Sequence, residues 1–189
     1  MKNIAIFASG NGTNAEAIIN HFDGSEIARV ALIIANKKDA YVLKRAANHN
    51  IPSRIINRNE FYDGHSLNEV LREYSIDLVV LAGFLWLIPS SLIDAYPGRI
   101  INIHPALLPS YGGKGMYGDR VHEAVKAAGD SETGITIHWV DENYDEGDIV
   151  FQARCSIESS DTPGDIASKV HKLEYQYYPP IIESILKNQ

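Results

Sequence analysis

Cysteine is nearly absent from this sequence: Cys155 is the only one among 189 residues. A single cysteine cannot form an intramolecular disulfide, and structural zinc sites need several cysteine or histidine ligands at fixed spacings. The chain also lacks an HExxH sequence or any other recognisable metal-binding pattern. We therefore expect a fold held together by its hydrophobic core, with no metal.

Long hydrophobic runs and an excess of positive charge are missing as well. The longest apolar run, 78–89, has 12 residues, whereas a membrane-spanning helix needs about 20. The first hydrophobic stretch is interrupted from Ser9 onward by glycines, unlike a secretory signal peptide. The net charge of −7 argues against binding to nucleic acid or an anionic membrane. We expect a cytoplasmic monomer or homodimer that acts on small molecules.

Short β-branched segments alternate with longer amphipathic segments along the chain. Strands are predicted at Ile4–Ala8, Val30–Ala35, Ser53–Ile56, Leu78–Leu81, Ile100–Ile103, Ile135–Val140 and Ile149–Ala153. Helices are predicted at Asn14–His21, Ala40–Asn50, Ser66–Tyr74, Pro89–Ala95, Arg120–Ala128 and Thr162–Leu186. The first four strands look apolar on both faces, as in a parallel sheet covered by helices on both sides. The pattern predicts a single α/β domain, Rossmann-like and doubly wound, with antiparallel strands near its C-terminal end.

Two polar residues interrupt the buried strand that ends at Pro105. Asn102 and His104 are two positions apart, so both side chains project from the same face of that strand. An amide and an imidazole placed together can donate hydrogen bonds to a developing oxyanion, and the imidazole can also move a proton. A buried polar pair with a purely structural role remains an equal alternative on these residues alone.

The turn after the first strand is rich in glycine. The segment Ser9–Ala15 places Gly10 and Gly12 at the start of a helix, where backbone N–H groups can bind a phosphate. It also fits the G-x-G-x-x-A dinucleotide fingerprint, which expects an acidic residue after the second strand. The chain has Asn36, Lys37 and Lys38 there, which counts against NAD but leaves NADP open. A tight turn without any ligand is the other alternative.

A hydrophobic loop follows the strand at 78–81 and leaves the sheet through Gly83. It carries Trp86 at the carboxyl end of a strand, the edge where open α/β sheets bind ligands. The loop is therefore a candidate wall for an aromatic ligand, and a turn packed in the core explains it equally well.

Carboxylates and histidines elsewhere give weaker signals. Asp145 lies in the acidic loop 141–148, and a carboxylate beside His104 would orient the imidazole and raise its pKa. His138 alternates with apolar residues, so it faces either the cleft or the solvent. The remaining candidates, His21, His49 and His65, lie on polar surfaces and are expected to be inert.

Several of these motifs occur in one order that resembles a known family. They are the Gly10–Asn14 loop, Leu81-Ala82-Gly83-Phe84, Asn102-Ile103-His104-Pro105 with Leu107-Leu108-Pro109, Gly134-Ile135-Thr136-Ile137-His138, and Asp145-x-Gly147. Together they resemble the folate-dependent glycinamide ribonucleotide formyltransferases of purine synthesis over essentially the whole chain. The resemblance implies the formyltransferase fold, with a phosphate- and nucleotide-binding half at 1–100 and a catalytic and folate-binding half at 101–189.

The resemblance also implies roles for individual residues. Asn102, His104 and Asp145 match the catalytic trio of the family. Substrate phosphate and ribose contacts are implied for Gly12, Thr13, Asn14 and Glu174. Contacts with the folate are implied for Leu85, Trp86, Leu87, Ile88, Asn102, Val140, Asp141, Tyr144 and Asp145. Two features depart from the pattern: many members carry arginine in place of Trp86, and the loop Tyr111–Gly118 is longer and richer in glycine.

The implied reaction is formyl transfer from 10-formyltetrahydrofolate, as co-substrate, to the primary amine of glycinamide ribonucleotide. A formyltransferase that acts on an amino sugar or on methionyl-tRNA is one alternative, although the negative net charge disfavours tRNA. Two alternatives come from other classes. An NADP-binding oxidoreductase would use Gly10–Ala15 and Lys37-Lys38, and a noncatalytic sensor of phosphorylated ligands would need only the glycine loop.

Overall fold

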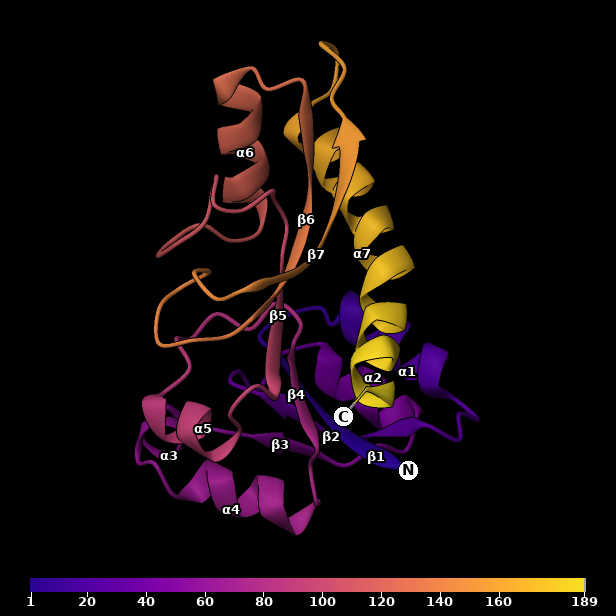
Figure 1. Ribbon diagram of the computed structural model, residues 1–189, viewed down its shortest axis with the longest axis vertical. Coiled ribbons are helices and arrows are strands. Elements are labelled where there is room, and N and C mark those ends of the chain that lie inside the picture. Colours follow the sequence, from indigo (N-terminus) through magenta and orange to yellow (C-terminus); the bar gives the residue numbers. More distant parts are fainter. Residues whose placement is uncertain (189) are drawn as a thin grey trace.

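The computed structural model describes residues 1–188, which form one seven-stranded sheet with helices on both faces (Figure 1). The strands are β1 (Lys2–Ala8), β2 (Ala28–Ala35), β3 (Ser53–Ile55), β4 (Leu78–Leu81), β5 (Ile100–His104), β6 (Glu132–Trp139) and β7 (Ile149–Ser156). The helices are α1 (Thr13–Phe22), α2 (Val42–Asn48), α3 (Arg58–Tyr62), α4 (Ser66–Glu73), α5 (Ser90–Ala95), α6 (Asp119–Ala128) and α7 (Pro163–Lys187).

The strand order is β3-β2-β1-β4-β5-β6-β7. The first five strands in the chain run parallel, and β6 and β7 are antiparallel to their neighbours. The chain starts in the middle of the sheet, moves out to β3 and returns to the other side of β1. This reversal between β1 and β4 is the switch point at which doubly wound sheets bind ligands. The predicted fold class is confirmed.

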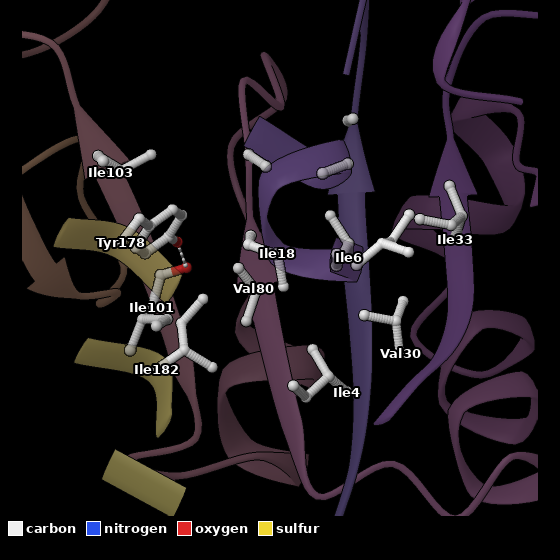
Figure 2. Packing of buried hydrophobic residues seen from close by; sticks show 14 of the residues in the cluster. Ile4, Ile6, Ile18, Val30, Ile33, Val80, Ile101, Ile103, Tyr178 and Ile182 are labelled. Carbon is white, nitrogen blue, oxygen red and sulfur yellow. Dashed lines mark hydrogen bonds between the residues drawn. The ribbon is translucent and has the colours of Figure 1, made fainter. Parts of the chain in front are cut away.

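Alternate residues of the central strands fill two separate cores. Ile4 and Ile6 of β1 face the layer formed by α1, α2 and α7, whereas Ala5 and Phe7 face α3, α4 and α5. Figure 2 shows the first layer, in which Ile18 of α1 and residues of α7 pack over the strands. Because side chains alternate across a strand, a central strand covered on both sides must be apolar throughout.

The last helix crosses this layer and is fixed at its start and its middle. Thr162 caps it and forms a reciprocal capping box with Asp165. The hydroxyl of Tyr178 is fully buried and donates to the carbonyl oxygen of Leu81 at 2.9 Å. This bond ties the middle of α7 to the end of β4, so the residues one turn earlier in α7 are held above the carboxyl edge of the sheet.

Two sequence predictions are wrong in detail. The strand predicted at 53–56 was expected to be apolar on both faces, but β3 is an edge strand with exposed side chains, and Ile55 is 48% exposed. Helix α3 was not predicted, because five residues are too few to show a helical period. Within residues 1–188, no helix is long and apolar enough to cross a membrane.

Candidate active site

A cavity of about 680 Å³ opens at the carboxyl edge of the parallel strands. Its walls are the loops after β1, β4 and β5, the loop between β6 and β7, and one face each of α6 and α7. This is where the switch-point rule places a ligand in an open α/β sheet. Both halves of the chain contribute, so the cavity lies between them rather than within either one.

The start of α1 forms one end of the cavity. Gly12 is the N-cap, and no side chain caps the helix, so the first backbone N–H groups of α1 remain available. Such groups, together with the positive end of the helix dipole, bind anions. Gly12 has a φ of 76°, and a Cβ there would lie 2.5 Å from a methyl carbon of Val42. Both the backbone conformation and the contact with α2 therefore require glycine.

The hydrophobic loop after β4 forms another wall, and the unpredicted helix α3 supports it. Phe61 of α3 packs edge-on against Trp86, with ring centroids 5.3 Å apart. Tyr62 donates from its hydroxyl to the carbonyl oxygen of Leu87 at 3.0 Å. At its other end, the backbone N–H of Leu85 donates to the hydroxyl of Ser9 at 3.0 Å. These contacts attach the loop both to α3 and to the turn that leads into α1.

The third wall carries the predicted trio. Asn102 and His104 leave β5 toward the cavity, and the loop after β6 returns to place Asp145 beside both. Oδ2 of Asp145 lies 3.5 Å from Nδ1 of His104 and accepts a hydrogen bond from the N–H of Gly113 at 3.0 Å. The return of the loop depends on Gly147, where a Cβ would lie 1.9 Å from a carbonyl oxygen of β6. The structure thus brings together residues 41 positions apart.

The imidazole of His104 has a defined proton position. Its Nε2 lies 2.8 Å from the carbonyl oxygen of Tyr111. A carbonyl only accepts, so Nε2 must carry the proton, and Nδ1 is then the basic nitrogen that faces Asp145. The ring is only 3% exposed. His104 is therefore held in one tautomer, with its free lone pair toward a carboxylate.

His138 completes the network, which resolves the question that its alternating sequence context left open. It lies opposite Asn102 in the antiparallel pairing of β5 and β6, and it is buried. Its Nδ1 donates to the carbonyl oxygen of Trp139 at 2.8 Å, so its Nε2 accepts from Nδ2 of Asn102 at 3.1 Å. The second N–H of that amide faces Asp145 at 3.4 Å, a long contact that can be exchanged for a ligand.

Asp145 raises the pKa of His104 as expected, but burial has the larger effect, so the net shift is downward. Burial lowers the pKa of this imidazole below 6.5, and the opposing effects of Asp145 and of the Tyr111 carbonyl are smaller. Burial would raise the pKa of the Asp145 carboxyl, but the neighbouring histidines, when they carry a proton toward it, and the N–H of Gly113 together lower that pKa below 3.8. At neutral pH the pair is therefore a neutral imidazole beside an ionised carboxylate.

Glu174 faces the cavity from α7, near the start of α1. Its Oε2 accepts a hydrogen bond from Nδ2 of Asn14 at 2.9 Å, and the residue is 6% exposed. Burial raises the pKa of this carboxyl, although Asn14 and nearby His171 oppose the shift. The hydrogen bond joins the beginning and the end of the chain across 160 positions.

Nearly all predicted site residues line this one cavity. The exception is Asp141, whose carboxylate instead accepts from the backbone N–H of Asn143. Lys37 also lines the cavity, although the sequence suggested it only for the NADP alternative, and His122 and His171 were not predicted at all. His171 precedes Glu174 by three positions, a spacing that places both on one face of a helix and could have identified it.

Other histidines lie outside this cavity and have local partners. His21 contacts Glu183 at 2.7 Å, His49 contacts Glu16 at 2.7 Å, and His65 contacts Glu69 at 3.1 Å. Within the described part of the chain, no group of three or more His, Cys, Asp or Glu side chains is arranged to hold a metal ion.

Comparison with known sequences gives full-length similarity. The formyl transferase family matches residues 2–182. The phosphoribosylglycinamide formyltransferase of Bacillus subtilis (strain 168) is 39% identical over 191 residues, which cover 98% of this chain and 95% of that protein. The chloroplastic phosphoribosylglycinamide formyltransferase of Arabidopsis thaliana is 42% identical over 194 residues, which cover 100% of this chain and 66% of that protein.

Solved structures give the same picture. Phosphoribosylglycinamide formyltransferase from Bacillus halodurans superposes with a TM-score of 0.88 at 40% identity, covering 98% of this chain and 95% of that one. Glycinamide ribonucleotide transformylase 1 from Symbiobacterium toebii superposes with a TM-score of 0.90 at 32% identity, covering 100% of this chain and 89% of that one.

Proposed function

This chain belongs to the formyl transferase family, and from that premise we propose that it transfers a formyl group from 10-formyltetrahydrofolate to the primary amine of glycinamide ribonucleotide, in de novo purine biosynthesis. The family resemblance found in the sequence is confirmed. The observation that carries the proposal is a single cavity that joins an anion-binding helix start to the Asn102–His104–Asp145 network.

The anion-binding end of the cavity suits the phosphate and the ribose of the amine substrate. Its phosphate is assigned to the N–H groups at Gly12, Thr13 and Asn14, where the helix dipole favours an anion. Its ribose is assigned to Glu174, whose carboxylate accepts hydrogen bonds from hydroxyl groups. Lys37 also lines the cavity and adds positive charge that complements a phosphate.

The apolar wall suits the pterin ring of the folate. Leu85, Trp86, Leu87 and Ile88 line this part of the cavity, and Val140 and Tyr144 line it as well. Apolar walls with a few fixed polar groups are typical of sites for flat heterocyclic ligands. The bound folate supplies the formyl carbon, which must lie between the amine and the trio for transfer to occur.

The trio is assigned to proton transfer and charge stabilisation. As the amine attacks the formyl carbon, it loses a proton, and Nδ1 of neutral His104 is placed to accept it. Asp145 then stabilises the imidazolium. Asn102 redirects the N–H that faces Asp145 toward the formyl oxygen as negative charge develops there. When the formyl carbon–nitrogen bond to the folate breaks, the imidazolium of His104 gives its proton to that nitrogen, which leaves as the N–H of tetrahydrofolate and returns His104 to its neutral form.

A coupled assay tests the function directly. The purified protein should convert glycinamide ribonucleotide and 10-formyltetrahydrofolate to the formylated ribonucleotide and tetrahydrofolate. Parallel reactions with an amino sugar and with methionyl-tRNA test the alternative amines, and NADPH binding tests the oxidoreductase. Absence of formyl transfer to the ribonucleotide, or faster transfer to another amine, would contradict the proposal. A cytoplasmic location, the choice between monomer and homodimer, and the division of the domain near residue 100 remain predictions.

A further inference from the structure

His122 is a buried polar residue that the assignments above do not use. It lies on α6 between Val121 and Val125, which pack with Ala106 in a small apolar cluster. It is 2% exposed, and its Nδ1 has no hydrogen-bond partner within residues 1–188. An unpaired buried polar atom costs stability. Because the residue also lines the cavity, a bound ligand can supply the missing partner.

The position of His122 limits which part of a ligand it can meet. Its ring lies 6.3 Å from that of His171 and perpendicular to it, and His171 is one helical turn from Glu174. His104 is also close enough to act on the charge of His122. His122 therefore belongs to the stretch of wall between the ribose-binding end of the cavity and the catalytic network.

The charge state of His122 indicates the chemistry of its partner. Burial lowers the pKa of this imidazole, and His171 and His104 add to the effect while Asp119 opposes it. A neutral imidazole offers one donor and one acceptor, which matches a hydroxyl group better than a phosphate. Rotation of the ring by half a turn exchanges the places of its nitrogens and carbons, so either nitrogen can face the cavity.

We propose that His122 is a substrate-contacting residue that hydrogen-bonds a ribose hydroxyl of the bound ribonucleotide. The inference rests on the proposed function for the identity of the ribonucleotide. It adds α6 to the elements that select the substrate and gives a ligand-dependent role to an imidazole that is otherwise unpaired.

The test is a double-mutant cycle in which one change removes the imidazole and the other removes a hydroxyl of the ligand. Calorimetry measures the affinity of wild type and His122→Phe for glycinamide ribonucleotide and for its 2′-deoxy and 3′-deoxy analogues, all without folate. We expect His122→Phe to weaken the parent ligand roughly three- to tenfold, the value of one hydrogen bond. The loss caused by removing one of the two hydroxyls should be smaller in the variant by that same factor.

Two further variants separate contact from structure. His122→Asn and His122→Gln place an amide near the positions of Nδ1 and Nε2, and at least one should retain most of the affinity. His65→Phe removes an exposed imidazole away from the cavity and should change nothing. The inference is overturned if removal of each hydroxyl weakens binding by the same factor in His122→Phe as in wild type. Failure of formyl transfer by a wild type that binds the ribonucleotide would overturn only the proposed function.

Discussion

The two ends of the cavity are built in different ways. The anion-binding end comes from one local segment, in which β1 runs into α1 and backbone N–H groups bind the ligand. The catalytic end combines β5, the loop after it, β6 and the loop after β6, and it binds through side chains. A site made of local backbone depends on backbone conformation, whereas a site made of distant side chains depends on the strand register that aligns them.

The largest effect is expected at the catalytic end. His104→Ala removes the proton acceptor and should lower kcat on the order of a hundredfold or more, with little change in the affinity for either substrate. Steady-state kinetics and calorimetry on the same preparation measure both quantities. His65→Ala is the matched control, since that imidazole is exposed and away from the cavity. Near-normal turnover of a folded His104→Ala variant would remove His104 from the mechanism.

Asp145→Asn tests the coupling within that end. The asparagine keeps the size of the side chain and removes the charge that raises the pKa of His104, so burial should lower that pKa further. kcat should fall by tens of fold, and the acid limb of kcat/KM, already below pH 6.5, should move to lower pH. NMR titration of the imidazole measures the shift. Asp148→Asn, in the exposed part of the same loop, should leave kcat and the His104 pKa unchanged. If the His104 pKa does not move in Asp145→Asn, Asp145 and His104 are not paired.

Gly12→Val addresses the anion-binding end. The new side chain would meet Val42 and would require a backbone conformation that valine disfavours, so α1 should move and the N–H groups with it. We expect the KM of the phosphorylated substrate to rise about tenfold, with the folate affinity nearly unchanged and the stability reduced. Gly24→Val is the control: it places valine at another positive φ, but the new side chain meets nothing within 4 Å. Backbone strain alone should lower the stability without raising this KM. Loss of folate affinity instead would reverse the assignment of the two ends.

Glu174→Gln should have the smallest effect, and its sign depends on pH. The pKa of Glu174 is raised in the folded protein, so its contribution to stability is full below about pH 4.5 and is lost as pH rises through the raised value. The variant should therefore unfold a few degrees higher than wild type at neutral pH and show no gain at about pH 4. Thermal unfolding at both pH values measures this. If the variant gains the same unfolding temperature at both, the charge of the Glu174 carboxylate is not the cause of the gain. The affinity for the ribonucleotide should fall at neutral pH.

The comparison of the two ends also separates what the sequence determined from what the tertiary structure decided. Local patterns predicted the seven strands, the start of the last helix near Thr162 and the glycine turn, because each depends on neighbours in the chain. Trp86 was identified as a wall residue, but its support by α3 was not, since a five-residue helix has no readable period.

The spacing of Asn102 and His104 indicated a possible catalytic pair, but only the resemblance to a family chose that role over a structural one and added Asp145. The pairing of Asn102 with His138 follows from the register of two antiparallel strands, and the approach of Asp145 follows from the return of a loop. The carboxylate that raises the pKa of His104 could be proposed from the sequence, but the burial that outweighs it could not. Desolvation depends on everything that surrounds a side chain, so only the assembled fold sets it.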